Sequence, residues 1–387
     1  MTWNIPEKQI VEMVTPPKFG RLAIAFSLVM ALIIILGMAI YHISRDERIF
    51  FYLLVASVAS VIFFTLSTGW FLFQYGLRLE KNEMIKVSNA NLEYFYSNWA
   101  LEYVSIVAYN YIFPDEAQIS NLKSRSEINV IGQKTLKFPA DVDYASLFYE
   151  VISPLRYLLI QLANNNALEI VFPMRSSGDQ STWSYFKLAW RRLGLNEETL
   201  KKPVWMVNDY VTQIDQWLTQ NDERFRLVVI CEPLVSLAEN DKEQASDGIS
   251  VWLCAPSAVA KNYQIEEKAK IYRAVYTNTE TLNEDLARVM IYQSKSGNID
   301  NVWFSKFNDQ DTLGEITRIC AEHNNGVKFR HNFSHFILGR QGVYDILQAV
   351  TLSLLSAHDE DSVNLIVSQD VFGISLSRVK IHRQNHA

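Results

Sequence analysis

The chain has 387 residues and a formal net charge of −6, with 49% hydrophobic and 20% charged side chains. An acidic chain of this kind lacks the basic surface that a phosphate backbone requires, so its composition excludes a nucleic-acid-binding protein. Three cysteines, Cys231, Cys254 and Cys320, occur without a C-x-x-C pair, which excludes a disulfide framework and a zinc knuckle and favours a reducing compartment.

Two long apolar segments near the N-terminus predict a transmembrane hairpin. Residues 22–41 and 49–73 carry no charge, and each segment is long enough to cross about 30 Å of hydrocarbon. The residues between them, SRDER at 44–48, are too few and too charged to remain in lipid. The alternatives are a cleavable signal peptide, which the immediate second span disfavours, and two buried core helices, which would be shorter.

The basic residues around the hairpin predict its orientation. They are more numerous on the outer flanks than at the tip, where only Arg45 and Arg48 occur; the flanking residues are Lys8, Lys18, Arg21, Arg78, Lys81 and Lys86. Basic residues favour the cytoplasmic side of a membrane. We therefore expect a multi-pass protein of a bacterial inner membrane, with its C-terminal domain in the cytoplasm.

The domain organisation follows from these spans. We expect a cytoplasmic tail at 1–21, a transmembrane hairpin of two helices at 22–78, a juxtamembrane helical stalk and linker at 79–134, and an α/β domain at 135–387. The stalk is rich in aromatic residues and compatible with a helix until Pro114 ends the pattern.

Short apolar runs alternate with longer helical patterns after residue 134. The expected helices are Leu147–Asn164 with a kink at Pro154, Thr182–Leu193, Val211–Thr219, Leu282–Tyr292, Leu313–His323 and Val343–Ser356. The expected strands are Leu168–Phe172, Val204–Val207, Leu227–Ile230, Val251–Cys254, Val302–Phe304, Val363–Ser368 and Ile374–Val379. Several of these runs are apolar on both faces, as in a sheet covered by helices on both sides. The pattern predicts an α/β protein with a layered α/β/α body.

Few residues of this domain suggest a catalytic, cofactor-binding or metal-binding role. The chain contains no G-x-x-x-x-G-K-[ST], G-x-G-x-x-G, H-E-x-x-H or G-x-S-x-G motif. His331 and His335 have a spacing that could place both imidazoles on one helical face, but no third ligand stands near them. The three cysteines are interpreted as core residues. The sequence therefore predicts no catalytic, cofactor-binding or metal-binding residue and no cofactor.

Three segments occur in an order that resembles the thiolase fold, specifically its β-ketoacyl synthase branch. LVVICEPLVSLAEN at 227–240 with DGISVWLCAP at 247–256 is similar to that family's paired central strands. VYTNT at 275–279 resembles its H-G-T-G-T loop, and SHFILGRQGVYDILQAVTLSLL at 334–355 resembles its G-H-x-x-G-A-A-G segment. Phe372-Gly373 resembles its closing Phe-Gly loop. The resemblance covers roughly residues 150–382 and implies a thiolase-like body.

The resemblance also implies where catalytic groups would stand. Condensing enzymes use a Cys thiolate at a helix N-terminus and two imidazoles. The position of the nucleophile is occupied by Asn208-Asp209-Tyr210, and the first His position by Val275, so only His335 remains. On this basis the sequence predicts a protein that is not an enzyme but a non-catalytic, membrane-anchored scaffold or adaptor. The alternative is a membrane-bound acyl-transfer enzyme of the condensing type with a non-standard active site.

The architecture as a whole is similar to uncharacterised inner-membrane proteins associated with type VI secretion systems. That resemblance implies an accessory role in a bacterial cell-envelope machine. The expected partners are proteins at the cytoplasmic face of the inner membrane, a second copy of the chain, and the lipid bilayer through two helices.

Overall fold

The computed structural model describes most of the chain. The described residues are 3–124, 130–132, 134–173, 180–206, 209–220, 222–232, 245–307, 309–340, 342, 344–356, 361–370 and 373–382. The chain divides into two compact units: a hairpin unit, Ile5–Phe95, and a body, Met1–Asn4 with Tyr96–Ala387.

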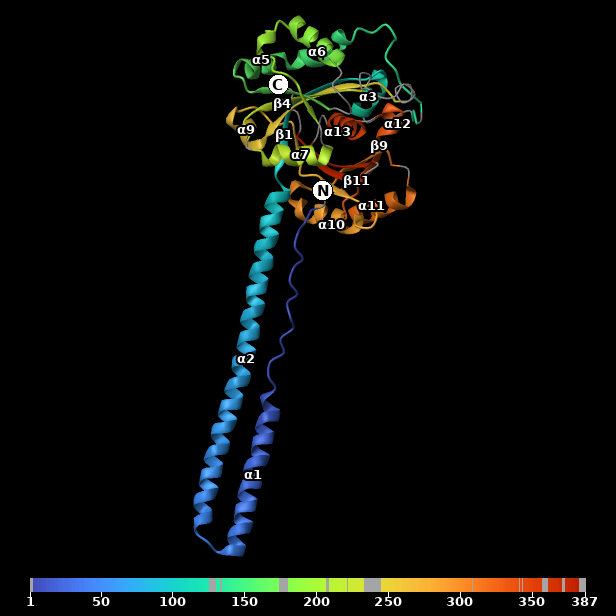
Figure 1. Cartoon of the computed structure of the whole chain (residues 1–387). Coiled ribbons are helices and arrows are strands. Elements are labelled where there is room, and N and C mark those ends of the chain that lie inside the picture. Colours follow the sequence, from blue (N-terminus) through green and yellow to red (C-terminus); the bar gives the residue numbers. More distant parts are fainter. Residues whose placement is uncertain are drawn as a thin grey trace. The chain divides into compact units, whose positions relative to one another are not determined.

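The hairpin unit contains α1 (Phe19–Ser44) and most of α2 (Arg48–Ala100), the two long blue helices of Figure 1. Their most apolar windows have mean hydropathies of 2.8 and 2.5, so both helices are long and apolar enough to cross a membrane. The chain reverses at Arg45, whose φ of 53° lies in the left-handed region. The predicted hairpin is present as an apolar helix pair.

Specific contacts hold the hairpin unit together. Gly37 of α1 lies against Leu53, whose side chain occupies the space that a Cβ at Gly37 would need. The rings of Phe26 and Phe64 stack with centroids 4.5 Å apart. These contacts place α1 against one face of α2.

The N-terminal segment lies along the same unit beyond the apolar part of α2. The Asn82 side chain donates to the carbonyl of Glu12 at 2.7 Å. The Asn89 side chain accepts from the backbone N–H of Gln9 at 3.0 Å and donates to its carbonyl at 2.8 Å. The tail therefore pairs with α2 through backbone groups that an extended segment leaves unsatisfied.

The body consists of two halves, and each strand of the first half has a counterpart in the second. The first half contains β1 (Tyr103–Ile112), β2 (Leu168–Pro173), β3 (Val204–Met206), β4 (Phe225–Cys231) and β5 (Ile249–Pro256). The second half contains β6 (Ala269–Tyr272), β8 (Asn301–Ser305), β9 (Arg330–Phe333), β10 (Ser362–Asp370) and β11 (Gly373–Ile381), with the short β7 (Val275–Thr277) paired to β11.

Strand pairing is the same in both halves. The order is β3-β2-β4-β5-β1 in the first half and β9-β8-β10-β11-β6 in the second. In each half the first three strands run parallel, and the fourth is antiparallel to its neighbours. β1 and β6 pair antiparallel and join the halves into one mixed sheet. The body is therefore a structural duplication.

Helices cover both faces of this sheet. They are α3 (Glu116–Ser124), α4 (Tyr144–Ile152), α5 (Arg156–Asn164), α6 (Gln180–Arg192), α7 (Tyr210–Thr219), α9 (Ser257–Asn262), α10 (Leu282–Tyr292), α11 (Gln310–His323), α12 (Ser334–Leu338) and α13 (Asp345–Ser356). One hydrophobic core joins α4, α5 and α6 to strands of the first half. A second core joins α7 and α13 to strands of both halves. The predicted layered α/β/α body is confirmed.

Several elements match their predicted positions closely. α10 covers Leu282–Tyr292, and Pro154 interrupts the predicted helix 147–164, which becomes α4, a 3₁₀ turn and α5. All seven residues of β4 are buried, as expected of a strand covered on both faces.

One prediction about secondary structure is wrong. Residues 103–112 were predicted as part of the helical stalk, but they form β1, which pairs with β5 and β6 in the middle of the sheet. α2 ends at Ala100, and the following segment is rich in β-branched and aromatic residues, which favour a pleated and buried position. The stalk is therefore confined to α2.

Candidate functional site

The N-terminal end of α7 forms the first part of the candidate site. Asp209 caps this helix by accepting hydrogen bonds from the backbone N–H of Thr212 at 2.9 Å and from its hydroxyl at 2.7 Å. The nucleophile position implied by the resemblance, Asn208-Asp209-Tyr210, falls here. Asn208 lies outside the described residues, and the helix end presents an exposed carboxylate rather than a thiol.

Tyr210 fixes the position of α7. Its hydroxyl forms a 2.9 Å hydrogen bond with the hydroxyl of Ser377 on β11, and both side chains are buried. Burial strongly raises the pKa of Tyr210, so this phenol stays neutral. The hydrogen bond holds the N-terminal turn of α7 against the second half of the sheet.

Tyr276 is the central residue of the site. It lies in the middle of β7, opposite Ser375 of β11, and its hydroxyl donates to Asp370 Oδ2. Burial raises the pKa of Tyr276, and the hydrogen bond to Asp370 and the charges of Asp370 and Asp209 raise it further. The half-buried phenol therefore remains protonated at neutral pH and can serve as a hydrogen-bond donor.

Asp370 joins Tyr276 to the turn between β10 and β11. While Oδ2 accepts from Tyr276, Oδ1 accepts from the backbone N–H of Gly373 at 3.0 Å. Gly373 has a φ of 147°, and a Cβ at this position would lie 2.6 Å from the carbonyl oxygen of Thr277. Only glycine permits this close approach of the turn to β7. Phe372, which the resemblance singled out, lies outside the described residues.

Asp209, Tyr276 and Asp370 together are named the Tyr276 cluster. Their three elements, α7, β7 and the β10–β11 turn, are far apart in sequence, and Asp209 is near enough for its charge to raise the pKa of Tyr276. The cluster combines a protonated phenol with two exposed carboxylates beside a helix N-terminus. Such groups can donate a hydrogen bond to a developing oxyanion and accept a proton from a nucleophile.

The cysteines do not take part in this site. Cys231, Cys254 and Cys320 are all buried, which confirms their interpretation as core residues. Burial raises the pKa of both Cys254 and Cys320 to about 12. Because the thiolate is the nucleophile, neither thiol is reactive at neutral pH.

His331 and His335, whose spacing could have placed both imidazoles on one helical face, lie in different elements. His331 lies in β9, where its Nε2 contacts the hydroxyl of Thr317 at 3.1 Å, whereas His335 lies in α12. The chain changes from strand to helix at Ser334, so the four-residue spacing carries no helical periodicity. His335 packs edge-on against Phe333 and Phe336, and burial lowers its pKa. Within the described part of the chain, no three metal-ligating side chains come together.

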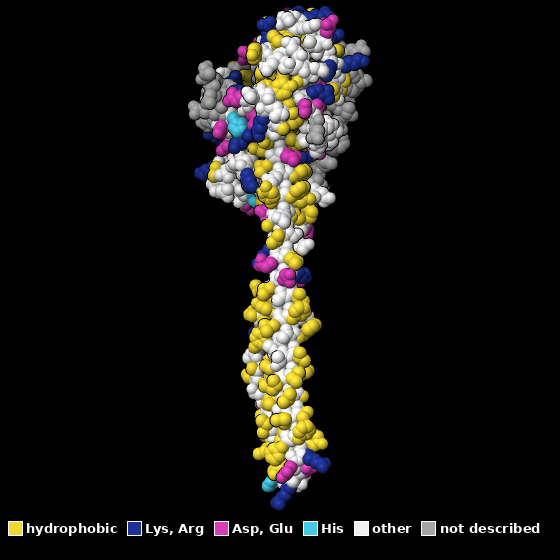
Figure 2. Space-filling view, turned by 90° about the vertical axis from the view of Figure 1, so that its left-hand side faces the viewer, with side chains coloured by type: hydrophobic (Ala, Val, Ile, Leu, Met, Phe, Trp, Pro, Cys, Tyr) yellow, Lys and Arg dark blue, Asp and Glu magenta, His cyan; other side chains and the backbone are white. Residues whose placement is uncertain are grey.

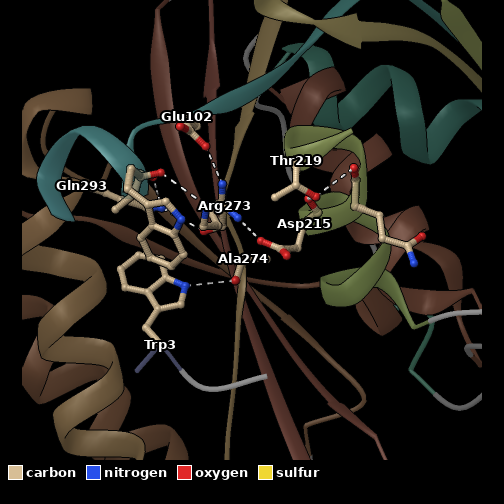
Figure 3. A network of polar contacts seen from close by, with 10 residues as sticks. Trp3, Glu102, Asp215, Thr219, Arg273, Ala274 and Gln293 are labelled. Carbon is tan, nitrogen blue, oxygen red and sulfur yellow. Dashed lines mark hydrogen bonds and ion pairs between the residues drawn. The ribbon is translucent and has the colours of Figure 1, made fainter. Parts of the chain in front are cut away.

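A second polar network lies where α2 enters the body (Figure 3). The buried guanidinium of Arg273, between β6 and β7, contacts the carboxylates of Glu102 and Asp215 and donates to the carbonyl of Trp99 at 3.3 Å. It also lies over the Trp99 ring, 4.3 Å from the centroid. Burial lowers the pKa of Arg273, while its contacts with Glu102 favour the charged form.

Trp3 and Gln293 extend this network. The Gln293 side chain donates to the carbonyls of Ala100 and Arg273, both at 2.9 Å. The buried indole of Trp3 donates to the carbonyl of Ala274 at 3.2 Å (Figure 3). The Trp3 ring also meets the Trp99 ring edge-on. Because Asp215 lies on α7 and Arg273 precedes β7, this network connects the end of α2 to two elements of the Tyr276 cluster.

No family model and no curated protein matches the chain. Solved structures do match. A chain from the complex of a type II polyketide synthase acyl-carrier protein with its ketosynthase has 12% identity and a TM-score of 0.50, covering 73% of this chain and 100% of its own.

Two further structures extend the comparison. A Streptomyces albus oxazolomycin ketosynthase domain has 10% identity and a TM-score of 0.48, covering 74% of this chain and 97% of its own. The peroxisomal 3-ketoacyl-CoA thiolase of Saccharomyces cerevisiae has 12% identity and a TM-score of 0.43, covering 73% and 98%.

The body has a thiolase-like fold. The resemblance noted in the sequence is confirmed at the level of fold. The same comparison contradicts the prediction that the protein is not an enzyme, because the chain that shares this fold at a TM-score of 0.50 comes from a ketosynthase complex.

Proposed function

We propose that the protein is a membrane-anchored acyl-transfer enzyme of the condensing type that reacts at the Tyr276 cluster. The observation that carries this proposal is the position of the cluster. It lies at the N-terminus of α7, where the resemblance places the nucleophile, and beside β7, where it places the H-G-T-G-T loop. The proposal replaces thiolate chemistry with oxygen-based groups, since the described cysteines are buried.

The residues suggest how the reaction is assisted. An acyl thioester whose carbonyl oxygen faces Tyr276 receives a hydrogen bond from the phenol as negative charge develops on that oxygen. A carboxylate of Asp209 or Asp370 accepts a proton from the attacking acceptor as the new bond to the acyl carbon forms. It returns this proton to sulfur as the C–S bond breaks, so that the thiol leaves. The dipole of α7 adds a favourable potential for the oxyanion. The hydrogen bond from Tyr276 to Asp370 keeps the phenol oriented before substrate binds.

The experiment that tests this function uses the purified full-length protein in detergent. It is supplied with acyl-coenzyme A or acyl-carrier-protein thioesters of increasing chain length, and released thiol is measured together with the acylated product. We expect thiol release at least 100-fold above the rate without protein for one range of chain lengths. Absence of release with every thioester would contradict the proposal.

A cytoplasmic position of the body is part of the proposal, because soluble acyl thioesters occur there. The outer flanks of the hairpin carry more basic residues than its tip. We predict that a reporter enzyme active only in the periplasm is inactive when fused to the C-terminus in a bacterial inner membrane. A matched reporter active only in the cytoplasm should be active at the same point, and the reverse pattern would contradict this orientation.

Dimerisation through the edge of the sheet is also proposed. β3 lies at one end of the strand order, and Val204 is 42% exposed there. Unpaired strand edges favour pairing with a second chain, and two-fold symmetry satisfies both copies. Replacing Val204 with Lys should raise the dimer dissociation constant about tenfold in light scattering on the full-length protein. The control Val327→Lys, at a residue 40% exposed, should leave it unchanged; equal effects would contradict the proposal.

A place in a type VI secretion system stays a prediction based on architectural resemblance. It no longer includes a scaffold role without catalysis. Affinity purification of the solubilised protein from its bacterial host tests it, because an accessory enzyme of such a machine should co-purify with envelope components of that machine.

A further inference from the structure

Apolar side chains of α2 are exposed on several faces, and on one of these faces they recur at a regular spacing. Positions spaced alternately by three and four residues follow this face from the membrane segment into the stalk. They are Phe63, Leu66, Trp70, Phe73, Leu77, Glu80, Met84, Val87, Asn91 and Tyr94, and we name them the α2 stripe. The eight apolar members are between 44% and 74% exposed. Figure 2 shows hydrophobic side chains along this helix.

The other parts of the hairpin unit contact different positions of α2. α1 contacts it at Leu53 and Phe64, and the N-terminal segment contacts it at Asn82 and Asn89. These four positions fall on the face of α2 opposite the stripe, because a helix turns 100° per residue. The stripe is therefore available to another molecule.

Two glycines beside the stripe support close approach of a second helix. A Cβ added to Gly69 or Gly76 would meet nothing within 4 Å, although glycine in a helix interior costs about 1 kcal/mol relative to alanine. Gly37 shows the use of glycine in this same hairpin, since it admits the side chain of Leu53. Small residues at helix interfaces in membranes allow backbones to approach closely. Within the described part of the chain, Gly69 and Gly76 have no such neighbour.

We propose that α2 of one copy pairs in parallel with α2 of a second copy along the α2 stripe. Two identical copies inserted in one membrane have the same orientation, so each stripe position meets its own counterpart. A spacing of 3.5 residues sustained over several turns is the pattern of a left-handed helix pair. Asn91 occupies a core position of this repeat, where a paired Asn fixes the register. Confinement to one membrane plane raises the effective concentration.

This proposal commits to a second copy rather than to a different protein. The stripe continues without a change of spacing from the apolar segment to Tyr94, so the partner must match both a membrane span and the soluble turns that follow. A second α2 has that length and repeat, and its own Gly69 and Gly76 lie at matching depth. The proposal does not depend on the acyl-transfer activity.

Cysteine cross-linking of the full-length protein in native membranes tests the pairing. Val87→Cys lies on the stripe, and Lys86→Cys, which is also exposed, lies one residue off it. The native cysteines are buried, so the unmodified chain sets the background. Under mild oxidation we expect at least ten times more covalent dimer for Val87→Cys than for Lys86→Cys. Equal yields, or Val87→Cys linked only to other proteins, would overturn the proposal.

A second variant tests the contribution of the two glycines to the interface by the same cross-linking measurement. Replacing both Gly69 and Gly76 with Ile in the Val87→Cys background should lower the dimer yield at least fivefold, because the added side chains separate the helices. The control Ala31→Ile alters an exposed position of α1 and should leave the yield unchanged. An unchanged yield in the double glycine variant would contradict the proposed interface.

Discussion

Replacing Tyr276 with Phe should lower the rate of acyl transfer by at least 100-fold while leaving the fold intact. The substitution removes only the hydroxyl, which donates to Asp370 and has a raised pKa. Loss of one donor to a developing oxyanion typically costs two to three orders of magnitude in kcat. The ring remains in β7, so thermal stability should change by no more than about 1 kcal/mol. Thiol release and thermal unfolding of the same preparation give both values.

The control for this experiment is Tyr157→Phe. Tyr157 is 79% exposed on α5, so its hydroxyl contributes neither to the core nor to the site, and activity should match that of the unmodified protein. An active Tyr276→Phe protein would show that the phenol has no part in the reaction. A variant that unfolds would instead assign Tyr276 a structural role.

Replacing Arg273 with Met should produce the largest loss of stability in the body. The buried guanidinium contacts two carboxylates, a carbonyl and the face of Trp99, and removal leaves the carboxylates without their cation. Breaking a buried ion pair costs about 3–5 kcal/mol. Because Glu102 is half exposed, we expect about 2–4 kcal/mol, measured as a fall in Tm of several degrees.

A matched surface substitution separates this effect from a general loss of positive charge. Arg318→Met breaks a pair with Glu322 in which both side chains are more than half exposed, so it should cost less than about 1 kcal/mol. Equal changes in Tm for Arg273→Met and Arg318→Met would contradict the role assigned to the Arg273 network. The same network lies beside α7 and β7, so Arg273→Met should also reduce activity.

The elements that the sequence predicted best are those with a strong local pattern. The helix Leu282–Tyr292 has apolar residues at helical spacing, and its bounds match α10. The run LVVI lies inside β4, which is buried on both faces. β1 was missed because Tyr103–Ile112 follows a long helix without a glycine or proline to mark the change. β7 has only three residues, too few to show any period.

The candidate site could be predicted only in part. The family resemblance placed a catalytic segment at VYTNT, residues 275–279, and aligned the family's first His with Val275. In the structure the neighbouring Tyr276 is the residue that contacts Asp370. No sequence pattern marked Asp370 as a site residue. Its contact with Tyr276, 94 residues away in sequence, depends on the tight turn at Gly373 and on the register between β7 and β11. The spacing of His331 and His335 was uninformative for a similar reason, since a spacing of four implies a shared face only within a helix.

The reaction of the unmodified protein after treatment with a thiol-alkylating reagent tests the central claim most directly. The described cysteines are buried, and the pKa of two of them is raised to about 12, so they should resist alkylation under native conditions. If the Tyr276 cluster carries out acyl transfer with oxygen-based groups, thiol release from the preferred acyl thioester should continue at an unchanged rate after treatment. Loss of the activity upon alkylation, with an acyl group recovered on a cysteine, would contradict this account.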